Sequence, residues 1–155
     1  MKKTPLVSII MPTHNRSVLM LESLKSVLRQ SYSNWELIII ADACNDNTNE
    51  VIIPYLQDER IIFLETKLNL GGGGARNLGL DTAKGEFISF LDDDDIWHKS
   101  KIKVQLDFLQ KRPEINLVFC NFNQWFKDGV KKEKKIKPSV SLNQLLVLNS
   151  IGSFS

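Results

Sequence analysis

Four consecutive carboxylates are the residues of this chain best suited to chemistry: Asp92, Asp93, Asp94 and Asp95. They follow the apolar segment 87–91, where a buried strand would end. Carboxylate oxygens suit hard divalent cations such as Mg²⁺, which serve many reactions of phosphate-bearing substrates. A run of like charges is also typical of a solvated loop or of a helix N-terminus. The run alone therefore leaves both a metal site and a solvated loop open.

A glycine-rich segment runs from Asn69 to Asn77 and contains glycine at 71–74, followed by Ala75 and Arg76. It differs from the dinucleotide-binding fingerprint, because Asn77 stands where a third glycine is required and because the segment does not follow the first strand. It also lacks the Gly-Lys-Ser or Gly-Lys-Thr of the phosphate loop of nucleotide hydrolases. One interpretation is a flexible turn before a helix. The other is a ligand site in which the Arg76 guanidinium, on the first turn of that helix, faces an anion or a nucleobase.

Short apolar runs alternate with amphipathic stretches along the chain, which indicates strand-helix units and a mainly parallel sheet flanked by helices. The near-continuous apolar runs are typical of strands buried on both faces. The predicted strands are 6–11, 37–41, 61–64, 87–91 and 115–122. The first predicted helix has Ser17 as its N-cap and ends before Tyr32. Further helices are predicted at about 47–57, kinked or shortened by Pro54, at about 74–83 and at about 99–111.

Polar residues follow three of these predicted strands. Residues 12–16 come after the first strand, Asp42 and its neighbours after the second, and the acidic run after the fourth. In sheets of this class the ligand lies beyond the carboxyl ends of the strands. We therefore expect these loops to converge on one edge of the sheet and to form a ligand site there.

The composition is typical of a soluble globular protein of one domain, with 155 residues, 43% of them hydrophobic and 25% charged. The net charge of +2 and the lack of interleaved aromatic and basic residues argue against nucleic acid as a partner. Cys44 and Cys120 are far apart and in no C-x-x-C arrangement, so neither a disulfide framework nor a thiolate metal site is expected. No apolar stretch has the length of a membrane span or of a signal peptide, and we expect a cytoplasmic protein.

Five segments in order resemble the family 2 glycosyltransferases of the GT-A fold. They are Val-Ser-Ile-Ile-Met-Pro-Thr-His-Asn-Arg at 7–16, Ser-Val-Leu-Arg-Gln-Ser-Tyr at 26–32, Glu-Leu-Ile-Ile-Ile-Ala-Asp at 36–42, Gly-Ala-Arg-Asn-Leu-Gly-Leu at 74–80 and Gly-Glu-Phe-Ile-Ser-Phe-Leu-Asp-Asp-Asp-Asp at 85–95. The resemblance implies a Rossmann-like sheet and transfer of a sugar from a nucleotide diphosphate sugar, with a UDP-sugar as the expected donor. It further implies Mn²⁺ or Mg²⁺ as cofactor, an inverting reaction, and a role in bacterial cell-surface polysaccharide synthesis.

The same resemblance implies roles for residues that match the family's motifs. Pro12 and Thr13 match the loop that contacts the nucleoside, and Asn15 lies in the same motif. Asp42 matches the acid that reads the base, where a carboxylate can accept a hydrogen bond from a uracil N–H. Arg76 matches the arginine that lies near the base and helps to hold the nucleotide.

The acidic run matches the Asp-x-Asp signature of the family. Asp94 is expected as a metal ligand together with Asp92, and Asp92 or Asp93 is expected to contact the ribose or metal-bound water. One or two carboxylates suffice, because phosphates and waters fill the other positions around the ion. Asp95 is expected to cap the following helix instead of binding metal. The cation would stabilise the charge that accumulates on the leaving nucleoside diphosphate.

Two regions depart from the family pattern. Ala41 stands where a further acid is often found, and Ala43-Cys44 stands where Gly-Ser is common, so the base contact would rest on Asp42 alone. His14 stands where tyrosine is common. It could stack on a base or make a polar contact, but we assign it no catalytic role, because a lone histidine is more often structural.

Residues 1–122 are predicted to form the nucleotide-sugar-binding core, and 123–155 the incomplete start of an acceptor-side region. Family members normally continue beyond this length with a half that supplies the acceptor site and, in inverting enzymes, an acidic general base. An alternative is therefore a catalytically incomplete fragment that binds nucleotide sugar and metal. A third class, a phosphoryl-transfer enzyme using Asp92 and Asp94, is disfavoured because such enzymes place the nucleophilic aspartate after the first strand.

The C-terminal residues carry weaker signals. A hairpin turn is predicted at Asp128-Gly129 and a short helix at 141–148. The lysines between 127 and 137 are interpreted as a solvated loop. The alternative is contact with anionic lipids at the inner face of the membrane, in keeping with a saccharide or lipid-linked acceptor. Exposure of Phe119, Phe122 and Trp125 would promote a homo-oligomer.

Overall fold

The computed structural model describes residues 4–125, 129 and 131–135. These residues divide after Val104 into two compact units, each described by itself below. The first unit contains a four-stranded sheet and carries the candidate site, and the second contains a two-stranded sheet. Every helix within the described ranges is too short or too polar to cross a bilayer.

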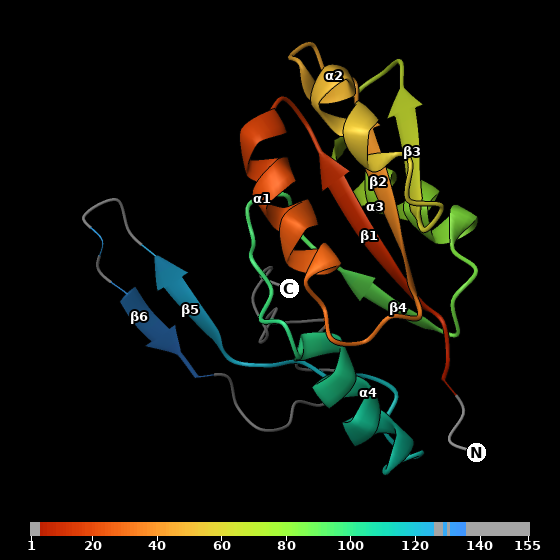
Figure 1. The fold of residues 1–155 in the computed structure, drawn as a ribbon, viewed down its shortest axis with the longest axis vertical. Coiled ribbons are helices and arrows are strands. Elements are labelled where there is room, and N and C mark those ends of the chain that lie inside the picture. The colour runs from red at the N-terminus through yellow and green to blue at the C-terminus, as the bar shows by residue number, and fades with distance from the viewer. Residues whose placement is uncertain (1–3, 126–128, 130, 136–155) are drawn as a thin grey trace. The chain divides into compact units, whose positions relative to one another are not determined.

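The first unit is built on a sheet with the strand order β3-β2-β1-β4, in which every neighbouring pair is parallel (Figure 1). Its strands are β1 (Val7–Thr13), β2 (Trp35–Asp42), β3 (Ile61–Thr66) and β4 (Phe87–Phe90). The helices are α1 (Ser17–Leu28), α2 (Thr48–Ile52) with the 3-10 turn η1 (Ile53–Tyr55), α3 (Gly71–Thr82) and α4 (Lys101–Gln110), which continues past the division. The predicted α/β class with a mainly parallel sheet is confirmed.

The central strands β1 and β2 are buried on both faces, as their continuous apolar sequences predicted. The chain passes from β1 to β2 in one direction along the sheet and from β3 to β4 in the other. Right-handed crossovers therefore place α1 and α3 on opposite faces, and Figure 1 shows α1 in front of the sheet and α3 behind it. The core on the α3 face is formed by Ile10, Ile38, Ile40 and Ala75.

Helix α3 approaches the sheet closely at Gly79. A Cβ at this position would lie 2.4 Å from Ile10 Cγ2 and 3.0 Å from Ile40 Cδ1, well inside normal carbon contact. Glycine is therefore required for this packing. The contact fixes α3 against the sheet and so fixes Arg76, which precedes Gly79 by about one turn toward the carboxyl edge of the sheet.

The helix ends agree with one prediction and differ from two others. Helix α2 ends at Ile52 and Pro54 lies in the 3-10 turn, so the predicted shortening by proline is confirmed. Helix α3 begins at Gly71, so the glycine run forms its first turn. The prediction that Ser17 is an N-cap is wrong, because α1 begins at Ser17 itself and Arg16 occupies the N-cap position.

The second unit contains an antiparallel pair, β5 (Phe122–Trp125) and β6 (Lys131–Lys134), with Gly129 at a φ of 78° between them. The predicted hairpin is thus confirmed in its strands, while Asp128 and the predicted helix at 141–148 lie outside the described residues. The predicted strand at 115–122 is wrong, since residues 115–121 belong to no strand. Apolar character indicates burial, but a strand also needs a hydrogen-bonded neighbour, and no described ladder reaches these residues. The predicted boundary after residue 122 stays a prediction.

Candidate active site

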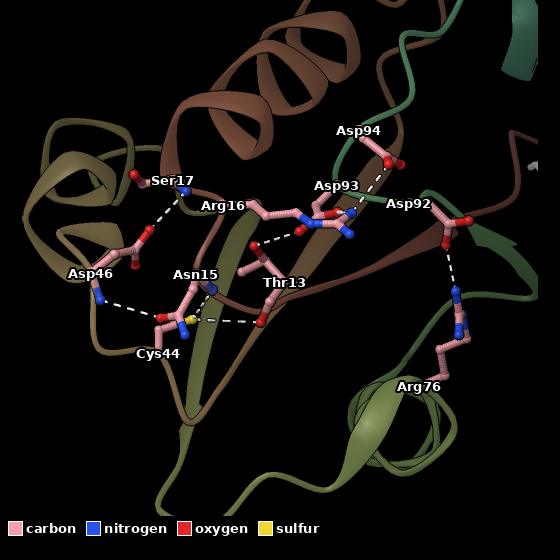
Figure 2. A network of polar contacts seen from close by, with 10 residues as sticks. All are labelled: Thr13, Asn15, Arg16, Ser17, Cys44, Asp46, Arg76, Asp92, Asp93 and Asp94. Atoms are coloured by element: carbon pink, nitrogen blue, oxygen red, sulfur yellow. Dashed lines mark hydrogen bonds and ion pairs between the residues drawn. The ribbon is translucent and has the colours of Figure 1, made fainter. Parts of the chain in front are cut away.

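The candidate site lies at the carboxyl edge of the four-stranded sheet, where the segments after β1, β2 and β4 meet (Figure 2). Thr13 is the last residue of β1 and Asp42 the last of β2, and the acidic run begins just after β4. The N–H of Leu91 donates to the carbonyl of Ile10, which carries the β1 to β4 pairing up to the run. The convergence expected from the order of strands and polar segments is therefore present.

The second carboxylate of the run, Asp93, points into the protein. Its Oδ2 accepts a hydrogen bond of 2.8 Å from the Thr13 hydroxyl, and its Oδ1 lies 3.1 Å from Arg16 Nη1. The side chain is only 8% exposed. A buried carboxylate is stable only when paired and hydrogen-bonded, and Asp93 meets both conditions. It therefore ties the acidic run to the end of β1.

The flanking carboxylates face other partners. Asp94 is half-exposed and its Oδ2 lies 3.1 Å from the same Arg16 nitrogen. Asp92 pairs with the guanidinium of Arg76 from the first half of α3. Two arginines from different segments thus offset part of the negative charge of the run. A Cβ at Gly72 would lie 3.0 Å from Arg76 Nη1, so glycine leaves space for this guanidinium.

Asp95 does not have the predicted role of a helix cap. Its N–H donates to the carbonyl of Asp92 at 3.1 Å and closes a turn. The next helix, α4, begins only at Lys101, so the prediction that Asp95 caps it is wrong. The turn instead separates the acidic run from the helix and leaves the run as a loop beyond the sheet edge.

The carboxylate of Asp42 is buried and holds the segment that leads into α3. Its Oδ1 accepts hydrogen bonds of 2.8 Å from the Thr66 hydroxyl and from the N–H of Leu70. The Thr66 oxygen in turn accepts the N–H of Ala43 at 3.0 Å. Asp42 therefore joins the ends of β2 and β3 to the start of the glycine run, a role that its sequence position alone did not indicate.

The loops after β1 and β2 are bonded to each other. His14 Nδ1 donates to the carbonyl of Asp42 at 2.5 Å, so this nitrogen carries a proton. Asn15, in the left-handed region at φ 55°, accepts the N–H of Asn45 on its Oδ1 at 2.6 Å and donates its own N–H to Cys44 Sγ at 3.4 Å. These bonds fix the loop that presents Thr13. His14 thus has a positioning role.

Ala43 also has a positive φ, 51°, which is costly for a residue with a Cβ. In this region the family resemblance favours glycine, for which the same conformation is cheap. The bonds around Ala43, including its N–H to Thr66, hold the conformation in place. The departure from the family pattern therefore costs backbone strain at the carboxyl end of β2, and these bonds compensate for it.

Asp46 makes structural contacts that the sequence did not predict. Its Oδ2 accepts the N–H of Ser17 at 3.0 Å, and its Oδ1 accepts both the N–H of Thr48 at 3.1 Å and its hydroxyl at 2.5 Å. One carboxylate therefore caps the N-termini of both α1 and α2. Burial alone would raise the pKa of Asp46, but the hydrogen bonds from Thr48 and Ser17 outweigh it and lower the pKa below its usual value.

The carboxylate oxygens of the acidic run suit a hard divalent cation whose coordination shell is completed by other ligands. No group of three or more His, Cys, Asp or Glu side chains placed to hold a metal occurs among the described residues. Asp94 is half-exposed, and its Oδ2 already holds a positive group, the Arg16 guanidinium. Asp94 and Asp92 can thus supply one or two oxygens, which is the number that suffices where phosphates and waters fill the other positions.

Comparisons with known proteins agree with this arrangement. A family model described as Glycosyl transferase family 2 matches residues 8–152. The UDP-Glc:alpha-D-GlcNAc-diphosphoundecaprenol beta-1,3-glucosyltransferase WfgD of Escherichia coli is 36% identical over 147 residues, which cover 95% of this chain and 57% of that protein. The chain spans about half the length of the curated relatives it matches.

Solved structures of the same fold include TarS and a mannosyltransferase. TarS 1–349 of S. aureus in complex with UDP-GlcNAc has a TM-score of 0.66 and 28% identity, covering 69% of this chain and 32% of that one. The mannosyltransferase PcManGT of Pyrobaculum calidifontis, in complex with GDP-Man and Mn²⁺, has a TM-score of 0.65, covering 70% of this chain and 33% of that one. At 24% identity the second likeness shows the fold alone.

Proposed function

This chain belongs to glycosyl transferase family 2, and we propose that it forms the donor-binding part of an enzyme that transfers a sugar from a nucleoside diphosphate to an acceptor. The predicted family is confirmed, and so is the GT-A fold. Since the chain spans about half the length of its relatives, the activity of the whole protein belongs to the proposal.

The observation that carries the proposal is the grouping of the acidic run with two arginines at one edge of the sheet. Asp94 faces outward and is half-exposed, while Arg16 and Arg76 supply the positive charge that a diphosphate requires. A site with carboxylates alone would repel such a ligand. The mixed set is suited to hold a cation and a diphosphate together.

The nucleoside is proposed to bind against the loops that follow β1 and β2. Thr13 and Asn15 shape the first loop, with Pro12 preceding them in β1. Asp42 holds the glycine segment with Oδ1, and we propose that its second oxygen, Oδ2, accepts the base N–H. A uracil base is supported by the UDP-Glc in the name of the E. coli relative and by the UDP-GlcNAc complex of TarS.

A divalent cation, Mn²⁺ or Mg²⁺, is proposed to be held by Asp94 and Asp92, and when bound it stabilises negative charge on the departing diphosphate. For Asp92 this requires that its carboxylate be shared with Arg76. Asp93 was predicted to contact ribose or metal-bound water. We propose instead that this buried group positions Thr13 and Arg16 around the ligand.

The acceptor and the stereochemistry are further parts of the proposal. The E. coli relative is named for an acceptor on diphosphoundecaprenol, a lipid carrier, which supports a lipid-linked saccharide and a position at the membrane surface. The reaction is proposed to be inverting. The second candidate is a fragment that binds the donor and the cation without transferring the sugar.

A thermal-shift screen of UDP, GDP and dTDP, each with and without Mn²⁺, tests the proposed donor site, because a ligand that binds only the folded protein raises its melting temperature. The proposal predicts the largest rise for UDP with Mn²⁺ and a lost rise in Asp94→Asn. Asp81→Asn, which removes the same charge from an exposed position on α3, is the matched control. Incubation with a UDP-sugar and an acceptor then separates the enzyme from the binding fragment.

A further inference from the structure

Arg16 contacts two carboxylates of the acidic run with one nitrogen. Its Nη1 lies 3.1 Å from Asp93 Oδ1 and 3.1 Å from Asp94 Oδ2, and Figure 2 shows the side chain reaching from the start of α1 across to the run. The sequence places Arg16 in the polar segment after β1 but assigns it no role of its own. Its position between the two carboxylates is the place where a cation would balance the charge of the run.

The two contacts of Arg16 differ in their surroundings. The Asp93 side chain is 8% exposed and also accepts the Thr13 hydroxyl, so this contact is anchored in the interior. The Asp94 side chain is 50% exposed. An ion pair between exposed groups is worth little and is readily exchanged, whereas a buried partner holds its cation firmly. Arg16 can therefore leave Asp94 while it stays on Asp93.

A divalent cation on Asp94 would stand beside a guanidinium of the same sign on the same carboxylate. Like charges at contact repel, and the Asp94 carboxylate cannot serve both at full strength. We propose that Arg16 occupies the place of the cation on Asp94 in the ligand-free protein and is displaced from Asp94, but not from Asp93, when the cation binds. This inference rests on the proposed function, since it takes Asp94 as the metal ligand.

The displacement has a consequence for the order and strength of binding. Without nucleotide, the cation must compete with Arg16 and binds weakly. With a nucleoside diphosphate present, the displaced guanidinium has a new anion nearby and the competition is relieved. Arg16 is then a positioning residue that couples cation and nucleotide binding, and the coupling acts equally in both directions.

Titration of Mn²⁺, followed by the electron paramagnetic resonance of the free ion, tests the competition. In the absence of nucleotide, Arg16→Gln should bind Mn²⁺ about two- to fivefold more tightly than the parent protein, the effect of losing one exposed ion pair. Arg29→Gln is the matched control, because it removes the same charge from the other end of α1, about 20 Å away along the helix. With UDP present, the gain from Arg16→Gln should shrink or reverse.

A measurement on the unaltered protein tests the same inference if the variant folds poorly. In the unaltered protein, the side-chain nitrogen signals of Arg16 should shift on addition of Mg²⁺ with the midpoint of Mg²⁺ binding, while those of Arg60 stay unchanged. Tightening that is equal in Arg16→Gln and Arg29→Gln, or Mg²⁺ saturation without a shift at Arg16, overturns the inference and leaves the metal site intact. Mn²⁺ binding that is unaffected by Asp94→Asn overturns the proposed metal site and this inference with it.

Discussion

Replacement of Asp42 separates its role in holding the loops from its proposed role in reading the base. The residue is 4% exposed, and its Oδ1 accepts two hydrogen bonds of 2.8 Å, from the Thr66 hydroxyl and the Leu70 N–H. Asp42→Ala removes the acceptor and leaves both donors without it. Asp42→Asn has the same shape and keeps an oxygen that can accept both bonds.

The magnitude follows from these two bonds. A hydrogen bond to a charged group is worth about 1.5–3 kcal/mol, so loss of both from a buried position amounts to about 3–6 kcal/mol before the site relaxes. Water can reach the sheet edge and recover part of this, so we expect Asp42→Ala to lower the free energy of unfolding by about 3 kcal/mol. Asp42→Asn keeps both bonds in neutral form and should cost about 1 kcal/mol.

Urea unfolding followed by circular dichroism gives both free energies, and calorimetric titration with UDP gives the affinities. If the Oδ1 bonds hold the loops, the alanine variant is clearly less stable than the asparagine variant. Equal losses of stability would refute that reasoning. A stable Asp42→Asn protein with weakened UDP binding would support direct base recognition, and unchanged UDP binding would leave Asp42 as a positioning residue only.

Further predictions concern packing and pH. Gly79→Ala should destabilise the protein by about 1–3 kcal/mol in urea unfolding, because its Cβ would meet Ile10 at 2.4 Å, whereas Gly73→Ala, with nothing within 4 Å, should be neutral or up to about 1 kcal/mol stabilising. The reverse order would show that α3 does not depend on this approach. Burial would raise the pKa of Asp46, but its hydrogen bonds lower it, so its stabilisation is present above the unfolded pKa of 3.8 and is lost as pH falls through the folded value. Asp46→Asn should therefore flatten the pH dependence of the melting temperature below about pH 4, while Asp81→Asn retains it; parallel slopes would argue against the cap.

The parallel sheet could be predicted because burial on both faces leaves a direct trace in the sequence. Residues 35–42 are buried without exception, and the apolar run from Leu37 to Ala41 reflects this. Once the strands are known, the convergence of Thr13, Asp42 and the acidic run follows from topology alone. The same signal gave a wrong strand at residues 115–121, because an apolar run does not identify the strand with which it must pair.

The contacts that bridge distant segments could not be predicted. Asp46 caps the N–H of Ser17 from a position 29 residues away, whereas the residues next to the helix start predict Ser17 itself as the cap. Arg16 lies 77 residues from Asp93, and only the folded sheet brings them together. The one signal in the sequence that could have indicated the Arg16 contact is the charge of the acidic run, because carboxylates that pack against other loops need cationic side chains nearby.

The central claim is that the acidic edge of the sheet binds a nucleoside diphosphate through a divalent cation on Asp94. Calorimetric titration with UDP in the presence and absence of Mn²⁺, on the unaltered protein, Asp94→Asn and the control Asp81→Asn, measures it directly. We predict that Mn²⁺ raises the UDP affinity of the unaltered protein and of Asp81→Asn by at least about tenfold and has little effect on Asp94→Asn. UDP affinity that is the same with and without Mn²⁺ in the unaltered protein, or an equal Mn²⁺ effect in Asp94→Asn, would contradict the claim.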